Sequence, residues 1–139
     1  MANHPTLVDR IGAMDAIHYL LRSVPLTCFG LALVTDIFYW QTSNLLWLHF
    51  SEWLLLVAVA FAGLAILAVL VDMLIRRVRP SWPAMLFGLV VFILGLINNF
   101  VHTADGWTAV VPFGLALSAA TVLAMIVTAW FGAEGARHV

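Results

Sequence analysis

Residues 54–75 read LLLVAVAFAGLAILAVLVDMLI, and Asp72 is the single charged side chain in this stretch. An apolar stretch of about 20 residues is long enough to cross the hydrocarbon core of a bilayer as a helix. Three further stretches of similar length and composition lie at about residues 20–40, 84–101 and 109–131. The sequence therefore predicts an integral membrane protein of the all-α class, in which four spanning helices form a bundle.

The composition agrees with this class and excludes others. Of the 139 residues, 64% are hydrophobic and 9% are charged, whereas about a quarter are charged in an ordinary soluble domain. Four spans and short connections use nearly the whole length, so we expect residues 1–139 to form a single membrane domain. A net charge of −1 and the absence of lysine argue against nucleic-acid binding. The one cysteine, Cys28, excludes a disulfide within the chain.

The arginines indicate the orientation in the membrane. Short connections make neighbouring helices antiparallel, so all six basic residues fall on one side of the membrane: Arg10, Arg22, Arg76, Arg77, Arg79 and Arg137. The positive-inside rule then places that side, with both termini, in the cytoplasm.

The first 19 residues do not resemble a signal peptide, because Asp9 and Asp15 interrupt them. Thr6, with Asp9 three residues later, is typical of a helix start, and apolar residues follow at helical spacing. We expect residues 1–19 to be retained and to form a short amphipathic helix on the inner interface before the first span.

Most polar residues at span depth gather at the outer end of the predicted bundle. Such residues are costly in hydrocarbon and each one requires an explanation. Antiparallel topology brings Asp36, His49, Glu52, Asn98 and His102 to a similar depth. His49 and Glu52 share one helix face, as do Asn98 and His102, because they are three and four residues apart. A pocket with two imidazoles and several carboxylates is expected there.

His49 and His102 have three interpretations. They are structural histidines that bond Glu52, Asp36 or backbone carbonyls, or the axial ligands of one b-type haem held between the second and third spans. As a third interpretation, they bind a non-haem metal together with Glu52 or Asp36. The absence of an outer arginine to pair with haem propionates argues against haem.

Small residues continue from this outer end into the bundle. Gly88 and Gly95 lie at seven-residue steps from His102, so they share its helix face. This groove fits either close helix packing or a flat cofactor such as a quinone ring. On the fourth span, a stripe of small and polar residues is expected to face the bundle: Gly114, Ser118, Thr121, Met125 and Thr128.

A smaller polar group lies at the inner end of the spans, with His18 and Arg22 on the first and Asp72 on the second. The simplest interpretation is an ion pair between Asp72 and Arg22 or Arg76, which fixes the helix ends at the interface.

The chain resembles the family of small bacterial membrane proteins known as DUF2231. The resemblance is strongest in DGW at 105–107, VPFGLALS at 111–118 and TAWFG at 128–132, and weaker support comes from 98–102, His18, Pro25, Asp36 and Asp72. It implies a bacterial inner-membrane location. It also implies an association with redox proteins, since related domains occur joined to Rieske or cytochrome c domains and beside quinoprotein dehydrogenases. The family's usual His-Pro pair is His18-Tyr19 here, and its second histidine before Pro25 is Ser23.

These observations predict a small redox subunit that binds a b-type haem or interacts with a quinone, and that works with a redox protein, a dehydrogenase or a second copy of itself. The alternative is a non-catalytic membrane anchor or assembly subunit without a cofactor, in which the polar cluster only holds helices together. No catalytic residue is assigned.

A proton or solute carrier would need a polar path to the inner side, and the middle of the spans offers only hydroxyls, Cys28 and Met125.

Overall fold

The structure is a computed structural model that describes residues 13–75, 81–104 and 110–137, with side chains for 16–75, 81–104 and 110–131. Four long helices make up these parts: α2 (Ala13–Thr42), α3 (Leu45–Ile75), α4 (Trp82–Thr103) and α5 (Leu115–Arg137). A short helical segment, η1 (Val110–Gly114), leads into α5. The described residues contain no strand.

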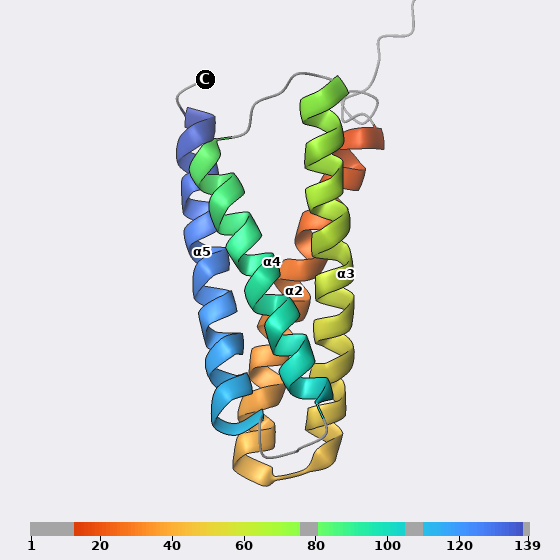
Figure 1. The fold of residues 1–139 in the computed structure, drawn as a ribbon, viewed down its shortest axis with the longest axis vertical. Coiled ribbons are helices and arrows are strands. Elements are labelled where there is room, and N and C mark those ends of the chain that lie inside the picture. The colour runs from red at the N-terminus through yellow and green to blue at the C-terminus, as the bar shows by residue number, and fades with distance from the viewer. Residues whose placement is uncertain (1–12, 76–80, 105–109, 138–139) are drawn as a thin grey trace, which may run out of the picture.

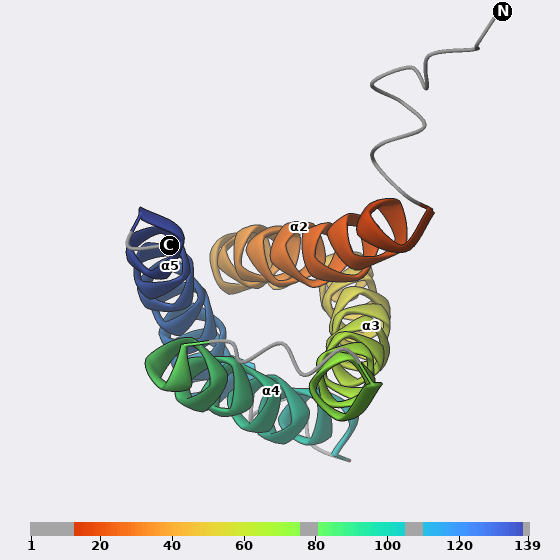
Figure 2. The same cartoon turned by 90° about the horizontal axis from the view of Figure 1, so that it is seen from above.

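The four helices form an up-and-down bundle (Figure 1). Seen from above, α2, α3, α4 and α5 follow one another around a ring, and α5 returns to the side of α2 (Figure 2). The start of α2 and the end of α5 lie at the same end of the bundle. The four-helix fold and the antiparallel arrangement of neighbours predicted from the sequence are confirmed.

Each long helix is apolar enough to cross a membrane, over Ala16–Thr42, Leu45–Ile75, Trp82–Thr103 and Val110–Phe131. The interior core is small and consists of Phe29, Ala32, Leu55, Ala58, Val91 and Met125. Many large apolar side chains lie on the outside instead, among them Leu67, Phe100 and Leu123. An apolar exterior around a small core is the arrangement that a surrounding bilayer stabilises.

The stripe expected on the last span faces the interior. Gly114, Ser118, Thr121 and Met125 are buried, and Thr128 is partly buried. The small side chains let α5 approach its neighbours closely, so the predicted rotation of this helix is confirmed.

Two helix boundaries differ from those expected. Residues 13–19 continue α2 without a break, so they do not form a separate interfacial helix, and the expectation for residues 1–12 falls outside the described residues. The second span begins at Leu45 instead of about residue 54. Ser51 interrupts the hydropathy of this stretch, yet its side chain is fully buried and hydrogen-bonded inside the bundle.

Candidate functional site

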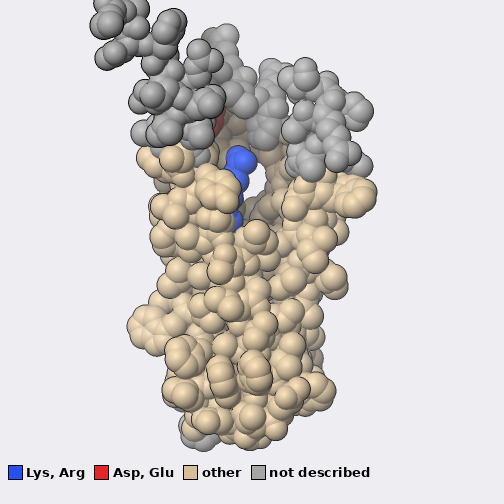
Figure 3. All heavy atoms as spheres, turned by 180° about the vertical axis from the view of Figure 1, so that it is seen from behind, with Lys and Arg blue, Asp and Glu red and all other residues tan. Residues whose placement is uncertain are grey.

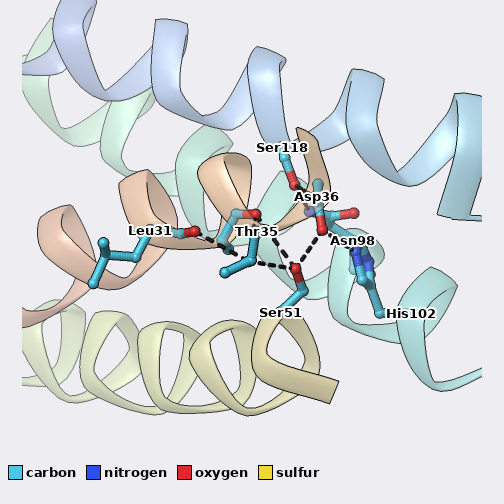
Figure 4. A network of polar contacts seen from close by, with 8 residues as sticks. Leu31, Thr35, Asp36, Ser51, Asn98, His102 and Ser118 are labelled. Atoms are coloured by element: carbon cyan, nitrogen blue, oxygen red, sulfur yellow. Dashed lines mark hydrogen bonds and ion pairs between the residues drawn. The ribbon is translucent and has the colours of Figure 1, made fainter. Parts of the chain in front are cut away.

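A buried carboxylate on α2 is bonded to side chains from all three other helices. Asp36 is fully buried. Its Oδ1 accepts hydrogen bonds from Ser51 Oγ on α3 and from the imidazole of His102 on α4, whose Nε2 lies 2.9 Å away. Its Oδ2 accepts a hydrogen bond from Ser118 Oγ on α5 at 2.5 Å. Figure 4 shows these side chains converging on Asp36.

His102 is held on both sides of its ring. The residue lies in the last turn of α4, and its side chain has no exposed surface. Nδ1 lies 3.0 Å from the backbone carbonyl of Asn98 one turn earlier, and Nε2 faces Asp36. Gly114 packs against the ring, where a Cβ would lie 2.8 Å from Cε1. The position and orientation of the imidazole are therefore fixed by packing as well as by hydrogen bonds.

A second layer of polar groups surrounds this centre. Thr35 Oγ1 lies 2.7 Å from Ser51 Oγ, and Asn98 Nδ2 donates to Ser118 Oγ at 2.7 Å. Thr35 also donates to the backbone carbonyl of Ala32 at 2.9 Å. We refer to Thr35, Asp36, Ser51, Asn98, His102 and Ser118 as the buried network. Because α2, α3, α4 and α5 each contribute to it, the network ties all four helices together.

The network satisfies nearly all of its own polar atoms, as a low-dielectric interior requires. Within the part of the chain that the structure describes, two buried side-chain oxygens lack a hydrogen-bond partner, Asn98 Oδ1 and Asn99 Oδ1. Burying an ionisable pair at this depth in a membrane is costly unless it is paired and hydrogen-bonded. The convergence of three donors on one carboxylate meets that condition.

His49 does not join the buried network. Its side chain is 62% exposed, and its Nδ1 lies 3.1 Å from Glu52 Oε2 on the same helix. His49 precedes Ser51 by two residues, which corresponds to about 200° around a helix, so the two side chains point to opposite sides of α3. The structure thus places Asp36, Asn98 and His102 of the expected outer site together and leaves His49 and Glu52 on the outside.

This arrangement does not bring together the residues that were expected to bind a metal ion or a haem. Among the described residues, no group of three or more His, Cys, Asp or Glu side chains is placed to hold a metal ion. A haem between His49 and His102 does not fit either, because His49 faces away and both nitrogens of His102 are already bonded. Haem ligation requires one free imidazole nitrogen directed at the iron.

The side chain of Phe29 fills the groove expected below His102 at Gly95, but not at Gly88. A Cβ on Gly95 would lie 2.6 Å from Cε1 of Phe29, so the phenyl ring of α2 packs directly on the backbone of α4. At Gly88 a Cβ would meet nothing within 4 Å. Close helix packing, and not an open channel for a cofactor, explains Gly95.

At the opposite end, His18 on α2 and Asp72 on α3 form a second pair, with Nε2 and Oδ2 3.3 Å apart. Asp72 contacts His18, which the sequence did not suggest as its partner, and the suggested pair with Arg76 lies outside the described residues. Arg22 is exposed one turn after His18. The space-filling view shows a hollow at this end of the bundle with an arginine side chain in it (Figure 3).

The His18–Asp72 pair borders an open cavity of about 280 Å³ between α2 and α3, and about half of the surface of Ile17, Leu64 and Leu67 in its lining is exposed on the outside of the bundle. Apart from the pair, the lining is entirely apolar and consists of Ile17, Leu21, Leu64, Leu67, Ala68 and Val71. The pair lies toward the end of the bundle that carries the arginines, because Arg22 follows His18 by four residues and Arg76 follows Asp72 by four. Arginines at helix ends mark a membrane boundary. Leu64 lies about 12 Å deeper along α3.

A family model described as "Predicted membrane protein (DUF2231)" matches residues 14–138. The chain belongs to the DUF2231 family. The match covers all four spans of this DUF2231 protein and its His18–Asp72 and Asp36–His102 pairs. Searches of curated proteins and of solved structures found no match.

Sequence reasoning missed the hydroxyl residues around Asp36 in this DUF2231 protein. Thr35, Ser51 and Ser118 were not among the expected site residues, although Ser118 was placed on the inward-facing stripe of the last span. The available signal was a carboxylate at span depth together with hydroxyl residues on inward faces at the same depth. That signal favours a serine-lined carboxylate over a histidine pair.

Proposed function

We propose that this DUF2231 protein is a small membrane subunit that binds a quinone in the cavity beside His18 and Asp72 and works with a redox partner. The observation that carries the proposal is the combination of one imidazole–carboxylate pair with an otherwise apolar cavity that opens on the lipid-facing outside of the bundle. This moves the quinone expected near His102 to the other end of the molecule.

The chemistry of the cavity suits a ligand with a polar ring and an apolar tail. An imidazole accepts a hydrogen bond from a quinol hydroxyl or, when protonated, donates one to a quinone carbonyl. Leu21, Leu64 and Leu67 form an apolar wall for the ring and the first part of the tail. A polar head near the membrane boundary with apolar contacts deeper in the bilayer matches the depth of these residues.

In this proposal the protein binds the quinone, and a partner redox protein exchanges the two electrons of the quinone–quinol couple. The His18–Asp72 pair is positioned to exchange the accompanying protons with the side that the arginines predict to be the cytoplasm. No step requires a metal or a haem in this chain.

Binding of a short-tailed quinone to the purified protein in lipid nanodiscs, measured by calorimetry, tests the proposal. Saturable binding is expected for the native protein. Ala68→Phe fills the cavity and His18→Leu removes the polar contact, so each variant is expected to weaken binding about tenfold or more, which corresponds to about 1.4 kcal/mol. His49→Leu is the matched control at the other end of the bundle and should bind normally. Absence of saturable binding, or unchanged binding in Ala68→Phe, would contradict the proposal.

A non-catalytic anchor is the second candidate, because polar contacts that join all four helices would stabilise the bundle without any ligand. An anchor binds no quinone but co-purifies with its partner. Its assembly with the partner should survive Ala68→Phe and be lost when the buried network is disrupted.

A further inference from the structure

The hydrogen bonds of His102 determine how many protons the Asp36–His102 pair holds. Both nitrogens of the ring face acceptors, since a backbone carbonyl oxygen accepts at Nδ1 and the Asp36 carboxylate lies at Nε2. A carbonyl cannot donate, so Nδ1 must carry a hydrogen. In a neutral imidazole Nε2 would then be a bare acceptor facing a carboxylate oxygen 2.9 Å away.

Two acceptors at hydrogen-bond distance repel each other unless a proton lies between them. We infer that Asp36 and His102 form a proton-binding site in the membrane that holds one proton in the folded protein. With that proton the pair has no net charge, which is the state that a buried position in hydrocarbon favours. The site is independent of the quinone cavity, which lies at the other end of the bundle.

The bonds to Asp36 place this proton on the imidazole. Ser51 donates to Oδ1 and Ser118 donates to Oδ2, so both oxygens of Asp36 already accept hydrogen bonds from hydroxyl groups. Together with His102 these donors stabilise the ionised carboxylate. The pair is therefore an imidazolium facing a carboxylate.

Within the described part of the chain, nothing else that titrates faces this pair. The neighbouring groups are Thr35 from α2, Ser51 from α3, Asn98 from α4, Ser118 from α5 and Gly114 from η1. Glu52 is bonded to the exposed His49, and its own side chain is 27% exposed. Asp105, the next acidic residue after His102 in the sequence, lies outside the described residues. The variant Asp105→Asn serves as the control for this residue.

Folding takes up the proton when the pH is above the normal pKa of histidine, about 6.5. In that range the unfolded chain has an ionised Asp36 and a neutral His102, whereas the folded chain keeps one proton more. Because the folded state binds the extra proton, it loses stability as the pH rises. The equilibrium constant of unfolding should increase about tenfold per pH unit over the range in which the two states differ by this one proton.

The test is the pH dependence of reversible unfolding in mixed detergent micelles from pH 6 to pH 9. In Asp36→Asn the new amide donates to a neutral His102 and its oxygen accepts from Ser118, while Ser51 can turn its hydrogen to the Ala32 carbonyl, 3.3 Å away. No extra proton is needed, so the tenfold dependence should disappear. Asp105→Asn should retain it.

The double variant His18→Gln/His49→Gln keeps the inference testable even if Asp36→Asn fails to fold. It removes the other two histidines of the described residues and leaves the buried network intact, so the tenfold dependence should persist. A flat profile in this double variant, or an unchanged slope in Asp36→Asn, would overturn the inference.

Discussion

Gly114 packs directly against His102, and a Cβ at position 114 would stand 2.8 Å from Cε1 of the imidazole. The ring cannot move away without lengthening its bonds to Asp36 and to the Asn98 carbonyl. Gly114→Ala should therefore lower the free energy of unfolding by about 1–3 kcal/mol, because it overpacks the site and weakens a buried pair. Thermal unfolding in detergent measures the change.

Gly88→Ala is the control for this substitution. A Cβ at Gly88 meets nothing within 4 Å, and alanine favours the helix over glycine by roughly 0.5–1 kcal/mol. The variant should be as stable as the native protein or slightly more stable. Equal effects of Gly88→Ala and Gly114→Ala would show that the packing of Gly114 on His102 is not important.

The contact between Gly95 and Phe29 leads to a second prediction. A Cβ at position 95 would lie 2.6 Å from Cε1 of Phe29, and Phe29 is part of the buried core. Gly95→Ala should cost about 1–3 kcal/mol of stability. Adding Phe29→Leu should recover part of that loss, with a coupling energy of about 0.5–3 kcal/mol in a double-mutant cycle. Strictly additive effects would argue against this contact.

The orientation of the bundle is the subject of a third prediction. The positive-inside rule predicts that both termini lie in the cytoplasm. Ser43 is an exposed residue in the turn between α2 and α3, with φ of 53°, so it tolerates an insertion. A topology reporter fused after Val139 should be active in the cytoplasm, and one inserted at Ser43 should be active outside. A cytoplasmic Ser43 reporter would reverse the orientation and the assignment of the quinone cavity to the inner side.

The spans could be predicted from the sequence because hydropathy along the chain is enough to detect a helix that crosses a membrane. The inward stripe from Gly114 to Met125 was also predictable, since small and polar residues at helical spacing mark a helix interface in lipid. Both features depend on local sequence alone.

The pairing of residues could not be predicted in the same way. His49 and Ser51 are polar residues at almost the same depth of α3, and only the rotation of the helix decides which of them faces Asp36. The outside of a membrane helix is as apolar as its inside, so hydrophobic periodicity does not set that rotation. For the same reason the contact of Asp36 with His102, 66 residues apart, depends on how α2 and α4 pack.

The central claim is that Asp36 and His102 share one proton inside the membrane, and the nitrogen resonances of His102 test it most directly. The protein is labelled with ¹⁵N-histidine, reconstituted in lipid and studied at pH 7.5, with His102→Gln used to assign the signals. We predict that both ring nitrogens of His102 carry a proton and that both signals change to those of a neutral ring in Asp36→Asn. A neutral His102 in the native protein, together with an infrared spectrum in which Asp36 is ionised, would contradict the claim.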